Sequence, residues 1–329
     1  MTDPLTRRAL LHRALLSLAA VASPVLASCG RRSSEPHDGA TTARSGAGST
    51  AHSPKLTWDA LTFPPSERHP HSQALVLTAG EPGGPMLIAL HGRGETRSPS
   101  VGARAWRDDY ALGRAHTRLG RPPLTKADFE GLVHPDHLRQ LNAQLKALPY
   151  RGLRVVCPYM PDLTRSDQAD VEHFAQFILH QLIPRAGRLS GGRPKPEQTG
   201  IAGISLGGRV ALLVGLSHPE AFGAVSGLQP ALSPSEAPHF ADLAFQARQQ
   251  RPGLLLRLVT SADDPFKPSV EALSTAWAER GLDHHTILTP GPHDYIWNRG
   301  PGSVGMLQWF DRALRGQAPT PNIKGATAP

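Results

Sequence analysis

Short, continuous runs of apolar residues recur along the middle and C-terminal parts of the chain. Six such runs cover residues 86–90, 153–157, 200–204, 223–226, 254–259 and 286–288. Continuous apolar runs of this length are typical of strands that are buried on both faces of a parallel sheet. We expect two earlier stretches, 56–63 and 74–78, to add antiparallel pairing at one edge of that sheet.

Segments with a helical period separate these runs. Apolar residues recur at helical spacing in 171–182, 270–277 and 304–314, and Gly281 and Gly316 stand where the last two helices should stop. Alternating strands and helices imply right-handed crossovers and a mostly parallel sheet with helices on both faces. Residues 93–150 break this alternation, so we predict that they form an insertion or lid beside the carboxyl edge of the sheet.

The N-terminal segment has the pattern of an export signal. Arg7, Arg8 and Arg13 precede an apolar stretch at residues 14–27. Fourteen helical residues span roughly 21 Å, less than the ~30 Å hydrocarbon core of a bilayer. The pattern therefore predicts a removable signal peptide over residues 1–28 rather than a membrane-spanning helix.

The end of this segment, Leu26-Ala27-Ser28-Cys29, resembles the bacterial lipobox. The resemblance implies that Cys29 is lipidated, becomes the new N-terminus and anchors an exported lipoprotein to a membrane of the cell envelope. The alternative is simple cleavage, with Cys29 incidental. Residues 6–11 also resemble a twin-arginine export signal.

Composition divides the remaining chain. Residues 29–54 are rich in small and polar residues without an apolar period, which predicts a flexible linker. A folded catalytic domain is expected over 55–316, and residues 317–329 are expected to be a disordered tail. If Cys29 carries lipid, the second cysteine, Cys157, has no disulfide partner and is expected to be a buried, unreactive thiol.

Overall composition excludes several classes of protein. The chain has 329 residues, of which 39% are hydrophobic, and only two are cysteines. No glycine period, sustained heptad or disulfide framework is present, so collagen, coiled coils and disulfide scaffolds are excluded. The net charge is +8, but no block of five or six basic residues occurs and aromatics do not alternate with arginines. We therefore expect no nucleic-acid partner.

The first chemical signal is the sequence Gly203-Ile204-Ser205-Leu206-Gly207. An apolar strand precedes Ser205 and a helix-compatible run at 210–216 follows it. This strand–turn–helix setting is the one that a nucleophile elbow requires, with glycines that let the strand and the helix pack closely. The alternative is a glycine-rich turn with a structural serine.

A serine hydroxyl needs a base, and the base needs an orienting acid. His293 follows the last predicted strand, whereas His284 and His285 stand before or within it and should lie at the other edge. Asp263 and Asp264 both follow the strand at 254–259; we favour Asp264 and keep Asp263 as the alternate. The order Ser205, Asp264, His293 is that of the α/β-hydrolases.

The oxyanion that forms when a serine attacks a carbonyl group needs hydrogen-bond donors that do not titrate. The backbone N–H of Leu206 is one candidate. The loop after the strand at 86–90 should supply the other, and we favour the amide of Arg93, with that of Gly92 as the alternate. His91 is expected to shape this loop rather than to transfer protons.

These residues together resemble the esterase D and enterochelin-esterase-like branch of the α/β-hydrolases. The resemblance rests on the motifs Ala202–Gly208, His218-Pro219-Glu220, Leu182-Ile183-Pro184, Asp264-Pro265-Phe266 and Gly291-Pro292-His293-Asp294. It implies an α/β-hydrolase fold with Ser205 as nucleophile, Asp264 as acid and His293 as base. Pro292 stands where the family often has glycine, and residues 93–150 match no family pattern.

The sequence thus predicts a serine-dependent carboxylic ester hydrolase of the cell envelope that works through an acyl-enzyme and needs neither metal nor organic cofactor. Its expected partners are a small-molecule or polymer-linked ester and, through Cys29, a membrane. Three alternatives stay open: a peptidase or acyltransferase with the same triad, a non-catalytic binding lipoprotein of the same fold, and a metal-dependent hydrolase.

Overall fold

The computed structural model describes residues 56–65, 72–189 and 191–317 of the chain. The predicted signal peptide, the lipobox with Cys29, the whole of the linker and residues 318–329 of the tail lie outside the described residues. Among the described helices, none has both the length and the apolar character needed to cross a membrane.

One eight-stranded sheet organises the described residues, in the order β1-β2-β4-β3-β5-β6-β7-β8. The strands β3 to β8 run parallel, whereas β1 pairs with β2, and β2 with β4, in antiparallel fashion. Their bounds are β1 Thr57–Thr62, β2 Gln73–Thr78, β3 Met86–Leu90, β4 Arg154–Pro158, β5 Thr199–Ile204, β6 Ala224–Leu228, β7 Leu255–Asp263 and β8 His285–Pro292. The predicted parallel sheet with an antiparallel edge is confirmed.

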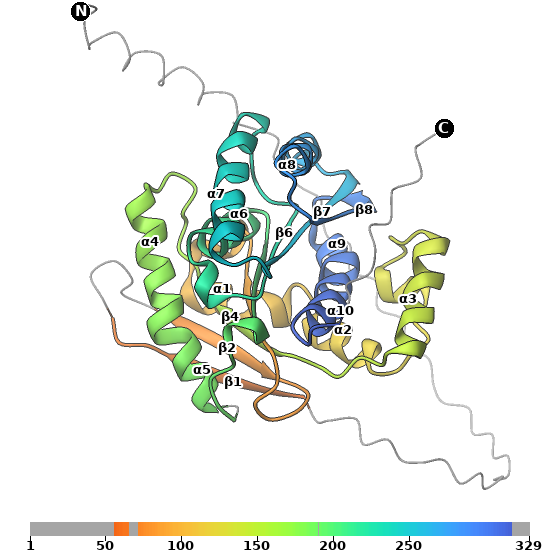
Figure 1. The fold of residues 1–329 in the computed structure, drawn as a ribbon. Coiled ribbons are helices and arrows are strands. Elements are labelled where there is room, and N and C mark those ends of the chain that lie inside the picture. Colours follow the sequence, from red (N-terminus) through yellow and green to blue (C-terminus); the bar gives the residue numbers. More distant parts are fainter. Residues whose placement is uncertain (1–55, 66–71, 190, 318–329) are drawn as a thin grey trace, which may run out of the picture. The chain divides into compact units, whose positions relative to one another are not determined.

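Helices cover both faces of this sheet (Figure 1). The first layer consists of α4 Gln168–Phe177, α5 Ile183–Leu189, α6 Leu206–Ser217, α7 Ala237–Gln250 and α8 Lys267–Glu279. One wider turn, Ile178–Leu182, joins α4 to α5. The opposite layer consists of α1 Pro99–Asp108, α2 Leu112–Leu119, α3 Pro135–Ala147 and α10 Ser303–Ala313. A short helix, α9 (Tyr295–Trp297), follows β8.

Burial explains why the strands have continuous apolar sequences. Every residue of β3, β4, β5 and β6 is buried, because side chains on both faces of these strands contact helices. Cys157 of β4 is a free thiol in this interior, and burial raises its pKa far above the usual range, as expected for an unreactive cysteine.

The segment 93–150 contributes a structural layer of the domain. Its helices α1, α2 and α3 bury residues such as Trp106, Leu112 and Leu145 in the same apolar cluster as α10. That any part of this segment serves as a lid stays a prediction.

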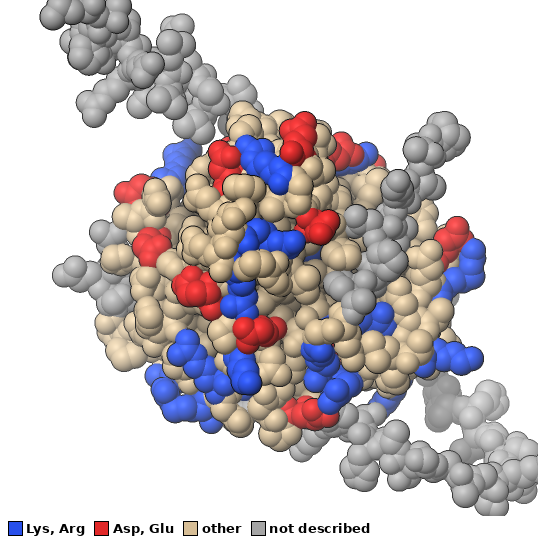
Figure 2. Space-filling model, viewed as in Figure 1, with Lys and Arg blue, Asp and Glu red and all other residues tan. Residues whose placement is uncertain are grey.

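Charged side chains of both signs share the surface. On the face seen in Figure 2, lysines and arginines lie among aspartates and glutamates. Mixed signs weaken the long-range field that a strongly single-signed surface would produce.

Candidate active site

Ser205 lies at the bend between β5 and α6. Its backbone has φ 57° and ψ −120°, a conformation that costs a non-glycine residue about 1–3 kcal/mol. Its N–H donates to the Leu228 carbonyl (3.0 Å), and its carbonyl accepts from the amide of Ala231 (3.0 Å). These contacts hold a strained serine at the carboxyl edge of the parallel strands, in the strand–turn–helix setting of a nucleophile elbow.

The flanking glycines are needed for close backbone approach. A Cβ on Gly203 would lie 2.2 Å from the Gly207 carbonyl oxygen, and a Cβ on Gly207 would lie 2.3 Å from the His91 carbonyl oxygen. Both contacts are with backbone, which cannot rotate away. Any side chain at Gly203 or Gly207 would therefore force the elbow apart.

Asp264 and His293 meet at the same edge of the sheet. Asp264 follows β7 and is buried, and its Oδ1 is 2.9 Å from the Nδ1 of His293. Oδ1 also accepts from the amide of Phe266 (3.0 Å), and Oδ2 accepts from the Thr260 hydroxyl (2.7 Å). The carboxylate is thus fixed by three donors. A proton on Nδ1 leaves Nε2 of His293 available as a base.

The alternate acid, Asp263, is placed differently. It is the last residue of β7, it is exposed, and in the ladder it lies opposite Pro292 rather than beside His293. The neighbouring Asp264 is the carboxylate that the structure brings to the imidazole.

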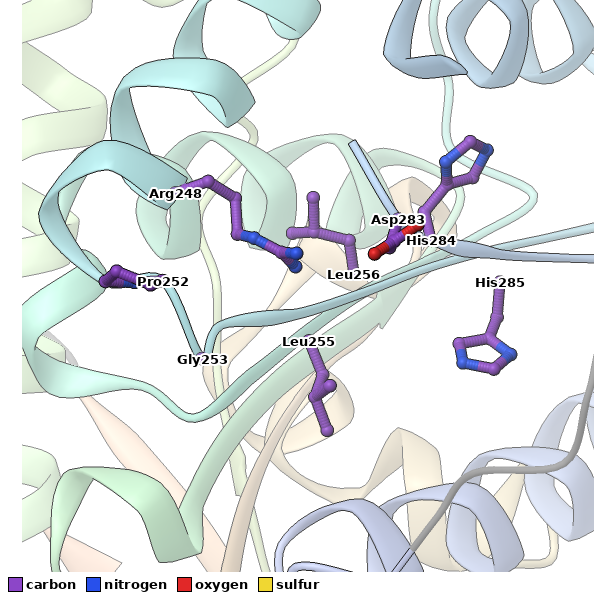
Figure 3. A pocket seen from close by; sticks show the side chains of 8 residues that line it. All are labelled: Arg248, Pro252, Gly253, Leu255, Leu256, Asp283, His284 and His285. Atoms are coloured by element: carbon purple, nitrogen blue, oxygen red, sulfur yellow. The ribbon is translucent and has the colours of Figure 1, made fainter. Parts of the chain in front are cut away.

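The other histidines near β8 lie at the opposite end of the strand. His284 and His285 line a hollow of about 370 Å³ together with Arg248 and Asp283, at the start of β7 and β8 (Figure 3). His293 follows the end of β8, so the whole strand separates it from this hollow.

The candidate oxyanion donors come from two loops. Leu206 is the first residue of α6, where an amide has no partner within the helix. The loop after β3 lies against the elbow, because a Cβ on Gly92 would be only 3.8 Å from the Cβ of Ser205. The amide of Gly92 donates to the Tyr110 hydroxyl (3.1 Å), whereas the Arg93 amide makes no hydrogen bond to another described residue. This difference favours Arg93 over Gly92.

His91 holds this loop in place through contacts of both its ring nitrogens. Its Nδ1 is 2.8 Å from the Gly92 carbonyl oxygen, and its Nε2 accepts from the amide of Met160 (2.9 Å). Burial lowers the pKa of the imidazole. A neutral ring with both nitrogens engaged suits the structural role expected for it.

A buried carboxylate, which the sequence analysis missed, joins the oxyanion loop to the histidine loop. Glu95 accepts from the Tyr110 hydroxyl (2.7 Å) and from the Tyr295 hydroxyl (2.5 Å), while Tyr110 in turn accepts from the Gly92 amide. Burial and the charge of Glu95 raise the pKa of Tyr295 to about 12, so this phenol stays protonated as a donor. We refer to Glu95, Tyr110 and Tyr295 as the loop clamp.

Gln229 is a second supporting residue that the sequence analysis missed. It follows β6 with φ 43°, and its side-chain amide donates to the Ser261 hydroxyl (2.6 Å) and to the Pro292 carbonyl (3.2 Å). These bonds tie the residue before His293 to the neighbouring strand ends. Neither Gln229 nor the loop clamp belongs to a local sequence motif.

The serine-to-histidine hydrogen bond is not formed in this structure. Among the described residues, the Ser205 hydroxyl has no hydrogen-bond partner. Catalytic hydrogen bonds are often long or misaligned in ligand-free enzymes and tighten when substrate binds. The elbow, the Asp264–His293 pair and the two loop amides all lie at the carboxyl edge of the parallel strands. Within the described residues, no group of three or more His, Cys, Asp or Glu side chains is arranged to hold a metal ion.

Comparison with known proteins gives a family match for part of the chain. Residues 160–291 match the family model described as "Putative esterase". This segment contains Ser205 and Asp264 and ends just before His293. No curated protein matches the chain in sequence.

Solved structures with similar folds include a ferulic acid esterase and two Staphylococcus aureus proteins. The ferulic acid esterase has a TM-score of 0.57 at 14% identity, over 79% of this chain and 99% of its own. An S-formylglutathione hydrolase has 0.56 at 13% identity, over 78% and 99%. A fluorophosphonate-binding serine hydrolase has 0.53 at 12% identity, over 78% and 98%.

These structures share the fold with this chain. At identities this low, nothing beyond the fold follows from the likeness. The fold, the elbow and the family match agree with each other. The described part of the chain has an α/β-hydrolase fold, and its residues 160–291 match the model of an esterase family.

Proposed function

We propose that the protein is a serine-dependent carboxylic ester hydrolase. The observation that carries this proposal is the strained bend at Ser205, at the same sheet edge as a histidine held by a buried carboxylate. A fold built around such a bend positions the hydroxyl for attack on a carbonyl carbon.

In the proposed mechanism, His293 removes the proton from Ser205 as its Oγ attacks the ester carbonyl. Asp264 fixes the imidazole tautomer and stabilises the imidazolium that forms. The amides of Leu206 and Arg93 donate to the oxyanion. His293 then protonates the departing alcohol, and an acyl-enzyme remains on Ser205. Water, deprotonated by His293, attacks this acyl-enzyme and releases the acid.

The test is hydrolysis of short-chain nitrophenyl esters by the full chain and by Ser205→Ala. We expect kcat/KM to fall by several orders of magnitude in Ser205→Ala, because the members of a triad act as a unit. The exposed Ser235 provides the control variant, Ser235→Ala, which should retain wild-type rates. Equal hydrolysis by Ser205→Ala and the unaltered chain would refute the mechanism.

An added alcohol or amine acceptor separates hydrolysis from acyl transfer. In the proposed hydrolase, water is the main acceptor, so free acid dominates the products. Preferential formation of a new ester or amide would instead assign the protein to acyl transfer with the same nucleophile.

We further propose that the hydrolase is an exported lipoprotein of the cell envelope, tethered through Cys29. The support is the sequence pattern of residues 1–29. With the linker at 29–54, this tether would place the active site close to the membrane surface and leave the domain free to reach large, immobile esters.

A further inference from the structure

Arg257 is a buried cation that has no counter-charge among the described residues. It lies in β7, only 5% of its surface is exposed, and its Nε and Nη1 make no hydrogen bond. No carboxylate among the described residues forms an ion pair with it. An uncompensated buried charge is costly, and each buried polar group without a partner calls for an explanation.

The same domain shows how a buried guanidinium is usually satisfied. Arg154 is 1% exposed, and it donates to the carbonyls of Gly84 and Gly192 at distances of 2.5–3.0 Å. Arg257 has no equivalent acceptors. Burial lowers the pKa of Arg257 to about 9, which is still above neutral pH, so the side chain remains a cation.

Two further buried polar side chains near Arg257 make no hydrogen bond. Ser226 lies opposite Arg257 on the neighbouring strand β6, and its hydroxyl is also buried without a partner. The indole ring of Trp309 lies 5.4 Å from the guanidinium carbon, and its N–H is likewise unpartnered. Three side chains near one another thus have buried N–H or O–H groups that make no hydrogen bond in this structure.

A small cavity adjoins this region. Its volume is about 20 Å³, and it is lined by Arg257, His137, Gly305 and otherwise mainly apolar side chains. Gly305 lies beside the guanidinium, because a Cβ on it would be 3.4 Å from Nη2. A space of this size holds one water-sized particle and no organic acid.

We propose that this cavity is a binding site for one monatomic anion, of the halide class, held by the Arg257 guanidinium. A halide accepts several hydrogen bonds, donates none and carries the charge that the guanidinium lacks. A water molecule would leave the cation uncompensated.

The anion would also account for the absence of a carboxylate here. Burial and the charge of Arg257 lower the pKa of His137 to about 4, so this neighbour is neutral at pH 7. It therefore adds no charge beside the guanidinium. The site is distinct from the candidate active site, because Arg257 is the third residue of β7 and Asp264 follows the end of that strand.

Diffraction from crystals of the full chain soaked in sodium bromide tests the site directly. We expect an anomalous bromine peak in the cavity, at hydrogen-bonding distance from the guanidinium of Arg257. Electron density in the cavity without an anomalous signal would identify water and overturn the proposal. Bromide found only at the surface would overturn it as well.

Thermal unfolding provides a second test in solution. At equal ionic strength, we expect the Tm to be about 2–4 °C higher in sodium bromide than in sodium gluconate, because a ligand of the folded state raises stability by mass action. Arg257→Met should fold, since apolar replacements of buried charges are often neutral, and should lose the difference. The exposed Arg139 provides the control Arg139→Met, which should retain it. A difference that persists in Arg257→Met would contradict the site.

Discussion

At the scale of single residues, the site depends on a choice between two adjacent carboxylates. Asp264 is buried and contacts His293, whereas Asp263 is exposed at the strand end. Sequence position alone could not separate them, because both follow the same strand. The backbone direction at the end of β7 decides which side chain turns inward.

We predict that Asp264→Asn lowers kcat for nitrophenyl esters by about 10³–10⁴-fold, because the amide no longer stabilises the imidazolium or its productive tautomer. The neighbouring Asp263→Asn is the matched control and should change kcat less than twofold. Steady-state kinetics of both variants measures this difference. A larger loss in Asp263→Asn would reverse the assignment.

Sequence motifs predicted the local part of the site and could not predict its support. The glycines around Ser205 are within two residues of it, so their pattern is visible in the sequence. Glu95 and Tyr295 are 200 residues apart, and their contact exists only because the ends of β3 and β8 share one sheet edge. Such a pairing has no signature in a single sequence.

At the scale of elements, the loop clamp connects the oxyanion loop after β3 with the histidine loop after β8. Tyr110 lies between α1 and α2 in the layer formed by segment 93–150, so this segment reaches the oxyanion loop. The clamp makes the position of the Arg93 amide depend on α1 and on the histidine loop together.

We predict that Tyr110→Phe lowers kcat by about 10-fold or more with little change in KM, because a misplaced oxyanion donor weakens transition-state binding selectively. The matched control is Tyr150→Phe, which removes a half-buried hydroxyl that contacts His116 away from this loop. Loss of stability without a selective effect on kcat would assign the clamp a purely structural role.

Prediction of the elements succeeded where the apolar pattern was strong. The predicted strand at 86–90 has the bounds of β3, because a fully buried strand needs apolar residues throughout. The helix α7 was not predicted, because alanine provides most of its buried face, at Ala237, Ala241, Ala244 and Ala247. Alanine contrasts weakly with polar residues, so the period of α7 is faint.

At the scale of the whole molecule, buried histidines make the fold sensitive to acid. Burial lowers the pKa of His116 and of His137 to about 4 each, and it also lowers the pKa of His91. The unfolded chain, with histidine pKa values near 6.5, therefore binds protons more readily than the folded one.

We predict that the free energy of unfolding is highest above pH 6.5 and falls by about 1–3 kcal/mol per buried histidine as the pH drops from 6.5 towards 4. Urea unfolding across this range measures the slope. His116→Gln removes one of these groups and should flatten the curve between pH 6.5 and 5. An unchanged curve would show that His116 does not contribute to the acid sensitivity.

The proposed tether also belongs to the whole chain. We predict that the full chain expressed in a bacterial host partitions with membranes and that Cys29→Ser moves it to the soluble fraction, because several acyl chains contribute about 0.8 kcal/mol per buried CH₂. Cys157→Ser is the matched control and should remain with the membranes. Membrane association of Cys29→Ser would refute the lipid anchor.

The central claim is that Ser205 is the nucleophile, and covalent labelling tests it most directly. Treating the full chain with a fluorophosphonate and mapping the adduct by peptide mass spectrometry should place a single phosphonyl group on Ser205. The label should be absent from Ser205→Ala and should form much more slowly in His293→Ala. An adduct on another residue, or equal labelling of Ser205→Ala, would contradict the account.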